Sequence, residues 1–489
     1  MQTEERATPH DGISSETGIP HGKGSQGGPW SPAYRTLTIG LLLTITGSAF
    51  EALAVATILP SVRDDLGGLA YYGWVFSAFM LTNLIGITVA GGEADLYGPG
   101  RPLVVGVGLF VAGLFVGGLA PSMPVLILAR AIQGFGAGII NSVAYVVIGR
   151  GYPERTKARM LALVSTAWVV PGLIGPAIAG FIADTVGWRW VFLGLTPLPI
   201  VAAAMTLPVV RKIPAGAAVR RDTKRIMRAV QLSFGAGVLV AGLGRSEPIW
   251  AIPLAVAGVL IMWPGLRSVL PPGTLRAKAG LPAALAMMGL LNFGFFGVEA
   301  FIPLGLTSLR AVTSSFAGIT LTAATVTWTT GSWLLAHVAA RQSRRLVAQI
   351  GLCLIVGGVV LSASVLSNSV PVVVAIVAWG VAGLGIGLAW STGSLVVLES
   401  APKGEEGAAT SSMQILNVLG TALGAGIGGV IVNGFSSGDD PTRLSLVLVD
   451  SAMVLVLVLT FFVAGRMPGR PTPKIENTSF TEAPVLVEA

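Results

Sequence analysis

Long apolar segments recur along the whole chain and constrain its fold more than any other feature. The run from Leu37 to Pro60 contains a single ionisable residue, Glu51. A helix of this length, rising ~1.5 Å per residue, crosses a bilayer core of roughly 30 Å. Of the 489 residues, 53% are hydrophobic and 11% are charged, whereas soluble domains carry about 25% charged residues. The sequence therefore predicts an all-α polytopic membrane protein.

The apolar segments predict fourteen transmembrane helices. Bounded by Gly, Pro or charged residues, they lie near 36–60, 71–92, 102–120, 124–149, 160–183, 190–210, 230–244, 249–266, 281–307, 313–338, 346–366, 371–398, 408–434 and 444–465. The segments at 230–244 and 249–266 are short and rich in Gly, so a position in the membrane interface is the alternative for this pair. Lys and Arg are concentrated in the tails and in alternate loops, which places both termini inside.

An internal repeat divides the hydrophobic region into two parts. LARAIQGFGAG, which begins at residue 128, aligns with VAWGVAGLGIG, which begins at 377. The alignment places Gly134 on Gly383 (383 − 134 = 249), and the same offset relates Pro153 to Pro402. Transporters are commonly built from such repeats, with the binding site between them. We predict two six-helix halves with an inserted helix pair.

The expected organisation follows from the repeat and from the loop composition. It comprises a disordered cytoplasmic tail (1–35), an N-terminal six-helix half (36–210), a basic loop with the inserted helix pair (211–280), a C-terminal six-helix half (281–465) and a second cytoplasmic tail (466–489). The first tail is rich in Gly, Ser, Pro and Thr and lacks the pattern of a signal peptide. The basic loop is read as a topology signal that attracts anionic lipid, not as a nucleic-acid surface.

The chain offers little for metal, cofactor or enzyme chemistry. Its single cysteine, Cys353, and its three histidines give no disulfide framework and no metal-ligand cluster. GIPHGKGS in the N-terminal tail is one residue too short for a phosphate loop, and neither GxSxG nor HExxH occurs. We therefore expect no metal, no cofactor and no enzymatic activity. Uphill transport would draw on an ion gradient or on a separate subunit.

Four stretches resemble motifs of the major facilitator superfamily, and within it of the fourteen-helix drug:proton antiporters. FEALAVATILPSV, LARAIQGFGAG, GLIGPAIAG and GWRWVFLGLTPLP resemble its first-, fourth-, fifth- and sixth-helix motifs, respectively. The resemblance covers nearly the whole hydrophobic chain. It implies a multi-pass protein of the plasma (inner) membrane, functional as a monomer, whose partners are a small-molecule substrate, protons and membrane lipid.

The function implied is proton-coupled export of hydrophobic or cationic small molecules by alternating access. Export of one dedicated metabolite or lipid is the alternative. A membrane-embedded enzyme and a non-transporting receptor are more remote alternatives, because no nucleophile and base stand together near the end of a span.

Five residues are candidates for proton coupling and substrate binding: Glu51, Arg130, Gln133, Glu299 and Trp379. An ionised side chain inside a span is costly unless it finds a partner. The first and fourth helices line the central cavity of the superfamily fold, so we expect Glu51 to contact Arg130 with Gln133 one turn deeper. In the other half, Glu299 stands near the repeat position of Glu51, and Trp379 takes the position of Arg130. An acidic and aromatic wall suits a lipophilic or cationic substrate.

The candidate gating residues lie in two places. In the fifth helix, Gly172, Gly175 and Gly180 with Pro176 predict close helix contact and a bend that seals the halves. The other place is the loop GGEADLYGPGR, where the family pattern Gly-x-Leu-Ala-Asp-Arg-x-Gly-Arg-Arg keeps its acid but loses most of its basic residues.

In the family, this loop holds Asp and Arg residues in a network that joins the two halves on the inner side. The loop here retains only Asp95 and Arg101 of these residues, so we expect an altered network. The partner predicted for Asp95 is Arg101, Arg155, Arg159 or the N-terminus of the helix that begins near Gly407, where the helix dipole favours a carboxylate.

Overall fold

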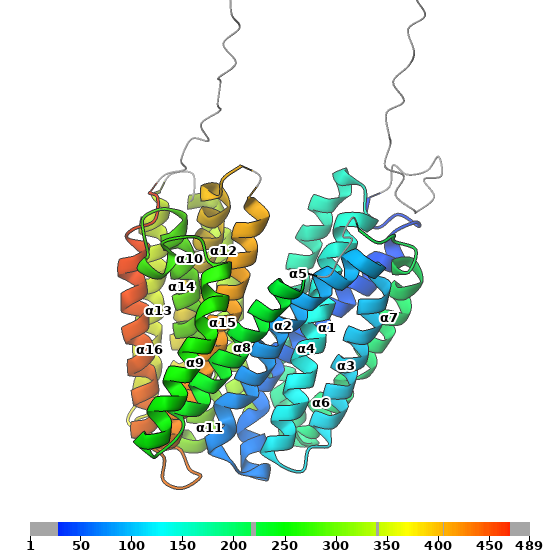
Figure 1. Ribbon diagram of the computed structural model, residues 1–489. Coiled ribbons are helices and arrows are strands. Elements are labelled where there is room, and N and C mark those ends of the chain that lie inside the picture. Colours follow the sequence, from blue (N-terminus) through cyan, green and yellow to red (C-terminus); the bar gives the residue numbers. More distant parts are fainter. Residues whose placement is uncertain (1–27, 217–221, 339–341, 404, 470–489) are drawn as a thin grey trace, which may run out of the picture.

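The computed structural model describes residues 28–216, 222–338, 342–403 and 405–469, and it consists there of α-helices packed side by side (Figure 1). The predicted tails 1–35 and 466–489 lie largely outside the described residues, as does part of the basic loop. Two groups of helices converge at the end where α1 ends and α16 begins, here the distal end. They diverge toward the opposite end, here the terminal end.

The N-terminal half contains six membrane-crossing segments, and the last of them is divided in two. Its helices are α1 (Arg35–Leu66), α2 (Tyr72–Tyr97), α3 (Gly100–Gly118), α4 (Met123–Gly151), α5 (Glu154–Thr185), α6 (Arg189–Leu195) and α7 (Pro197–Val210), with the short 3₁₀ turn η1 (Leu69–Tyr71) before α2.

The C-terminal half repeats this arrangement after the inserted pair α8 (Thr223–Leu243) and α9 (Pro248–Val269) and the 3₁₀ turn η2 (Thr274–Arg276). Its helices are α10 (Leu281–Glu299), α11 (Ile302–Arg310), α12 (Ser314–Val338), α13 (Arg344–Val365), α14 (Val374–Ser400), α15 (Glu406–Gly434) and α16 (Arg443–Ala464). The division between α10 and α11 precedes Pro303, which has no N–H to donate to the carbonyl four residues earlier.

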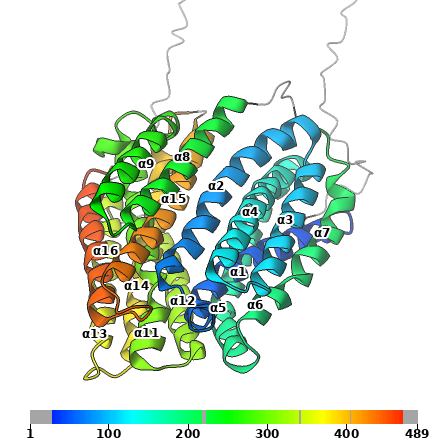
Figure 2. The same ribbon diagram turned by 60° about the horizontal axis from the view of Figure 1, so that its bottom comes forward.

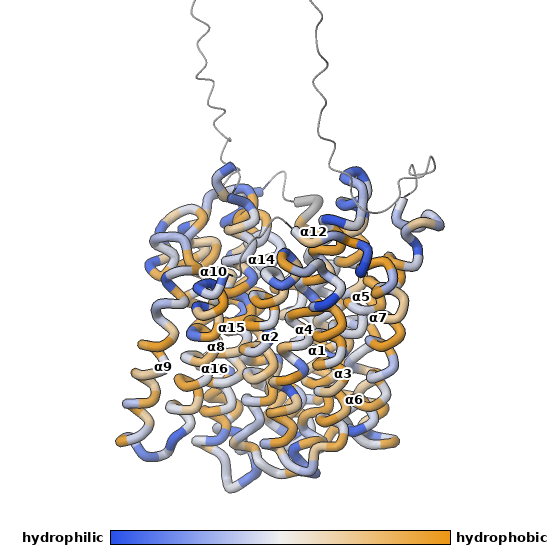
Figure 3. The backbone as a smooth tube through the Cα atoms, turned by 45° about the vertical axis from the view of Figure 1, so that its right-hand side comes forward, coloured by the Kyte–Doolittle hydropathy of each residue, from blue (hydrophilic) through white to orange (hydrophobic). Residues whose placement is uncertain are grey.

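The predicted fold class is confirmed. Thirteen of the described helical segments are long and apolar enough to cross a membrane. The helix α12, which has 25 residues and is rich in threonine, lies among them as the fourteenth. Figure 3 shows apolar residues along the middle of the helices and polar residues gathered near the two ends of the molecule.

Several predicted boundaries differ from the structure, among them those of the first helix and of the inserted pair. The first helix continues through Pro60 to Leu66, because Val62 remains in the core and membrane helices tolerate proline where neighbouring groups compensate the lost hydrogen bond. The inserted helices α8 and α9 are longer than expected, since α8 starts at Thr223 and includes residues predicted to be loop. Helices α8 and α9 are therefore both long enough to cross the membrane.

The inserted pair packs on both halves. Helix α8 contacts α2 of the N-terminal half and α15 of the C-terminal half, and α9 covers α8 on the outside (Figure 2). A separate apolar cluster joins these four helices through Leu81, Leu232, Met262 and Leu419. The pair therefore covers one side of the boundary between the halves.

Glycines let the backbones of α2 and α4 approach closely. A Cβ atom added at Gly138 would lie 2.2 Å from the Asn83 carbonyl oxygen, and one added at Gly86 would lie 2.3 Å from that of Phe135. Helix association in membranes depends on such small residues because lipid tails leave little hydrophobic drive. The α2–α4 pair is therefore a tightly packed unit of the N-terminal half.

The replacement Gly138→Leu is expected to destabilise the protein, because the new side chain meets backbone atoms of α2. Overpacking of this kind costs about 1–3 kcal/mol or more, so the apparent Tm in detergent should fall by several degrees. Gly149→Leu, in the same helix, is the matched control because nothing lies within 4 Å of its added Cβ atom. Equal Tm values for the two variants would contradict the tight packing.

Candidate functional site

An ion pair lies buried inside the N-terminal half. Arg130 of α4 donates through Nη1 to Oε1 of Glu51 on α1, and their side chains are only 3% and 2% exposed. The predicted contact between these residues is therefore present in the structure. A charge in such a position is stabilised by its partner, and removing one partner leaves the other buried and uncompensated.

Further groups hold Arg130 in place. Its Nη1 also donates to Oε1 of Gln133 at 2.6 Å, as the predicted proximity of these residues requires, and its Nε donates to the Val75 carbonyl oxygen at 3.3 Å. Its guanidinium carbon lies 4.1 Å from the centre of the Phe79 ring. Nothing in the sequence distinguishes Phe79 or Val75 from other apolar residues of the span. Their proximity follows from the register of α2 against α4.

Two polar atoms at this site have no hydrogen-bond partner among the described residues. They are Oε2 of Glu51 and Nε2 of Gln133, both buried. The site can therefore still accept a proton or a hydrogen bond at the carboxylate and donate one from the amide. Buried polar groups in this condition are costly, so each of them calls for an explanation.

The C-terminal half presents aromatic rings where the N-terminal half has its ion pair. Trp379 is fully buried and stacks on Phe295, with ring centres 5.0 Å apart. Phe295 in turn meets the edge of Trp328, which contacts Trp390. Glu299 lies one turn after Phe295 at the end of α10, and it forms no ion pair among the described residues. The two halves thus differ in charge at corresponding depths.

The fifth-helix motif forms a contact between the halves. A Cβ atom added at Gly180 would lie 2.4 Å from the Ser314 carbonyl oxygen, and one added at Gly318 of α12 would lie 2.2 Å from that of Pro176. Backbone therefore touches backbone along α5 and α12. The close helix contact predicted for this motif is present.

The remaining glycines of the motif face two different helices. Gly172 approaches Thr325 of α12, with only 2.1 Å between an added Cβ atom and Cγ2. A Cβ atom added at Gly175 would lie 3.3 Å from the ring of Phe50 on α1. Phe50 directly precedes Glu51 in the sequence. Larger residues at these positions would separate α5 from its neighbours.

The predicted partner of Asp95 was wrong. Asp95 forms its ion pair with Arg150 in the last turn of α4, because the tight α2–α4 packing brings the ends of these helices together. Arg101 instead lies over the Tyr97 ring, 5.4 Å from its centre. Both side chains of the ion pair are partly exposed, at 41% for Asp95 and 31% for Arg150.

The C-terminal half has a similar ion pair with the charges exchanged. Arg344 at the start of α13 pairs with Glu399 at the end of α14, with 3.1 Å between nitrogen and oxygen. Glu399 stands at the repeat position of Arg150 (399 − 150 = 249). Each half therefore ties two of its own helices together at the terminal end by an ion pair.

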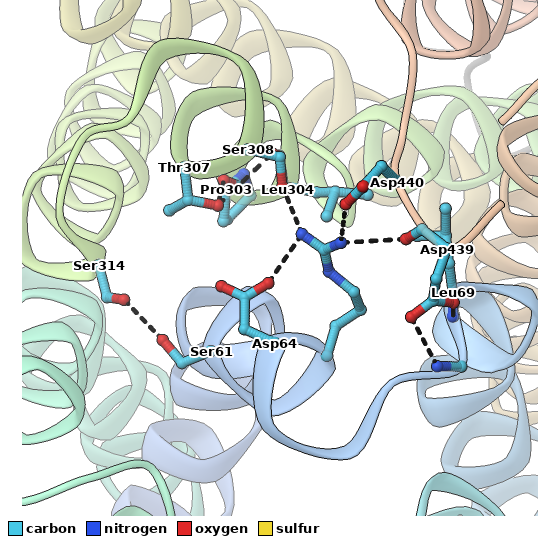
Figure 4. A network of polar contacts seen from close by, with 12 residues as sticks. Ser61, Asp64, Leu69, Pro303, Leu304, Thr307, Ser308, Ser314, Asp439 and Asp440 are labelled. Carbon is cyan, nitrogen blue, oxygen red and sulfur yellow. Dashed lines mark hydrogen bonds and ion pairs between the residues drawn. The ribbon is translucent and has the colours of Figure 1, made fainter. Parts of the chain in front are cut away.

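A polar cluster around Arg63 joins the halves at the distal end (Figure 4). Arg63, near the end of α1, pairs with Asp64 at 2.7 Å and with Asp440 of the α15–α16 loop at 3.0 Å. It also donates to Ser308 Oγ and to the Asp439 carbonyl oxygen, each at 3.0 Å. Its side chain is 8% exposed, so this arginine is held on several sides.

Two carboxylates extend the distal contact. Asp439 accepts hydrogen bonds from the Gly68 and Leu69 N–H groups at 3.0 and 2.6 Å. On the other side, Asp184 of α5 accepts hydrogen bonds from the N–H groups of Ser314 and Ser315 at 3.0 and 2.8 Å, at the start of α12. Hydrogen bonds that free N–H groups donate to a carboxylate are comparatively strong. The halves are therefore joined at the distal end by backbone as well as side-chain groups.

Comparison with known proteins identifies the family. The family model described as Major Facilitator Superfamily matches residues 37–386. The chain belongs to this superfamily. It is therefore a multi-pass membrane transporter by family, a class without enzymatic activity.

Relatives of this superfamily member include named multidrug transporters. It is 27% identical over 418 residues to the multidrug transporter protein MdtP of Bacillus subtilis, covering 82% of this chain and 75% of the relative. It is 28% identical over 427 residues to a probable multidrug-efflux transporter of Mycobacterium tuberculosis, covering 83% and 90%.

Solved structures of the superfamily share the fold. A D-xylose-proton symporter aligns with a TM-score of 0.63 at 14% identity, covering 89% of this chain and 98% of that one. A bacterial homologue of the lysosomal transporter Spinster, in an inward-facing and unoccupied conformation, aligns with a TM-score of 0.63 at 15% identity and the same coverage.

A cysteine pair can test the distal contact of this transporter. Ser61 and Ser314 approach within 2.9 Å between their Oγ atoms across the two halves. Ser61→Cys combined with Ser314→Cys, in a Cys353→Ser background, should form a disulfide on mild oxidation, because the two side-chain γ atoms already lie in contact. Transport should stop on oxidation and return with reductant if the distal end must open.

The single-cysteine variants serve as controls and should not respond to oxidation. Crosslinked protein that transports at the rate of the reduced protein would contradict a distal opening step.

Proposed function

We propose that this transporter exports hydrophobic or cationic small molecules in exchange for protons by alternating access. The observation that carries the proposal is the buried pair of Glu51 and Arg130, in which one carboxylate oxygen has no partner. Multidrug transporters among the relatives support the substrate class. The protein acts as a monomer in the plasma (inner) membrane, surrounded by lipid, with both termini inside.

Glu51 is the proton carrier in this proposal. Burial disfavours the charged form of a carboxyl group, whereas a nearby guanidinium favours it. The proton occupancy of Glu51 therefore depends on its distance from Arg130 and on access to water. Gln133 offers its free amide N–H to the same carboxylate when the helices shift.

Substrate binding is assigned to the space between the halves, with the aromatic cluster and Glu299 as its C-terminal wall. Stacked rings accept flat or cationic molecules, and a carboxylate without a basic partner balances their positive charge. Trp379, at the repeat position of Arg130, replaces a cation by a ring and so removes a repulsive group for a cationic substrate. The two halves thereby divide proton coupling and substrate recognition.

Gating is assigned to contacts at both ends of the molecule. The distal end is closed by the Arg63 cluster and by α5 against α12, including Gly172, Gly175, Pro176 and Gly180. Asp95 and Arg101 at the terminal end belong to the opposite gate, with Arg150 as the partner of Asp95. With both termini inside, the conformation described corresponds to one that faces inward.

Transport of ethidium into inverted vesicles with an imposed pH gradient tests the proposal. Glu51→Gln and Arg130→Ala should each lower gradient-driven uptake at least about tenfold at matched protein levels, because neither retains a titratable ion pair. Glu247→Gln, at an exposed position before α9, is the matched control and should transport like the wild type.

Full coupled uptake in Glu51→Gln would contradict the proton-carrier role. If neither the wild type nor the control moves ethidium or other lipophilic cations, the substrate class proposed here is wrong, and one dedicated metabolite or lipid takes its place.

A further inference from the structure

We propose that Phe79 is a positioning residue for Arg130, and that its ring stabilises the guanidinium group when Glu51 no longer carries a charge. This inference rests on the proposed proton coupling at Glu51. The ring keeps Arg130 on α4 beside α2 when the Glu51 carboxylate takes up a proton. The arginine then stays in place while α1 is free to move.

The geometry places the ring under the cation. The guanidinium carbon of Arg130 lies 4.1 Å from the ring centre, and the Val75 carbonyl oxygen, one turn earlier on α2, accepts its Nε–H. Phe79 and Arg130 are both buried, so neither group exchanges this contact for water. A desolvated cation over an aromatic face is the strong case of this interaction.

The backbone near this contact is held by direct helix contact. Gly134, one turn after Arg130, approaches the Phe79 carbonyl oxygen so closely that an added Cβ atom would lie 2.2 Å away. Gly138 approaches Asn83 of α2 in the same manner, one turn further along each helix. Phe79 and Arg130 therefore belong to one tightly packed unit and keep their relative position.

Glu51 belongs to a different group of helices. Helix α1 packs chiefly along α5 and α7 and meets α4 only locally. The carboxylate is therefore the one member of the site whose helix can shift relative to the α2–α4 unit. A guanidinium without an anchor on that unit would follow the carboxylate instead.

Arg130 is the only charged group near Glu51 among the described side chains. Helix α7 carries no charged residue, the described side chains of α12 carry none, and α6 and α11 contribute only Arg189 and Arg310 near the distal end. The charged residues of α5 lie in its first two turns and its last turn: Glu154, Arg155, Lys157, Arg159 and Asp184. The charge state of Glu51 in this proposal therefore depends on how Arg130 is stabilised once the carboxylate is protonated.

The proton balance is simple. A proton from water binds the Glu51 carboxylate, the ion pair becomes a neutral acid beside a cation, and Arg130 keeps its charge over the Phe79 ring. Without the ring, the guanidinium remains with the carboxylate. Proton uptake then requires a higher proton concentration.

The test measures ethidium exchange in proteoliposomes at equal pH on both sides, across a series of pH values. Phe79→Leu should shift the midpoint of the pH profile by about one unit to lower pH, a tenfold change in proton concentration that corresponds to about 1.4 kcal/mol. Phe79→Trp should retain the wild-type midpoint because it keeps an aromatic face. Phe76→Leu is the matched control, because Phe76 lies on the same helix but its ring packs against Tyr72.

A merely structural role of Phe79 would lower exchange at every pH without moving the midpoint, and that result would overturn the inference, as would a shift to higher pH. Where Phe79→Leu does not accumulate, Phe79→Met carries the same test. If Glu51→Gln loses coupling while Phe79→Leu keeps the wild-type midpoint, this inference fails and the proposed function stands. If Glu51→Gln retains coupled transport, the proposed function fails.

Discussion

A guanidinium and a carboxylate buried among apolar helices impose the strictest requirement on this fold. Each charge would cost several kcal/mol alone in the membrane interior, so the helices must bring compensating groups to them. Three helices do so: α1 supplies Glu51, α4 supplies Gln133 beside Arg130, and α2 supplies a carbonyl oxygen and the Phe79 ring. The compensation is incomplete, since one oxygen of Glu51 has no hydrogen-bond partner among the described residues. In the proposed exchange cycle, this oxygen of Glu51 is the atom that takes up the proton.

Glycine contacts allow this arrangement, and both halves use them. In the N-terminal half, Gly134 lies against α2, and in the C-terminal half Gly383 lies against the Ala324 carbonyl oxygen of α12, where an added Cβ atom would come within 2.2 Å. The backbone frames of the halves are thus alike. The side chains that they present differ, because position 130 holds a cation and position 379 holds a buried indole. One frame therefore supports a charged site in one half and an aromatic site in the other.

The sequence predicted those features in which few alternatives exist. The contact of Arg130 with Glu51 was predicted because an arginine inside an apolar span needs an acidic partner, and because the first and fourth helices line the central cavity of the fold that the motifs resemble. The repeat and the close contact of the fifth helix were also predicted. The contact of Phe79 with Arg130 could not be predicted from the sequence, because it depends on the register of two helices rather than on residue type. The partner of Asp95 was missed because the motif directs attention to its own loop, whereas the packing of α2 on α4 supplies Arg150. The cluster around Arg63 was also missed, because its sequence position is that of an ordinary charged residue near the end of a span.

Helix α1 connects the buried pair to the distal contacts. It runs from Arg35 to Leu66 and carries both Glu51 and Arg63, which stand twelve residues apart, or roughly 18 Å along a helix. At the first position α1 is tied to α4 of its own half, and at the second it is tied to Ser308 and Asp440 of the other half. In the proposed exchange cycle, protonation of Glu51 weakens only the first tie. A shift of α1 then acts directly on the Arg63 cluster. A single helix is therefore enough to couple proton uptake to opening of the distal end.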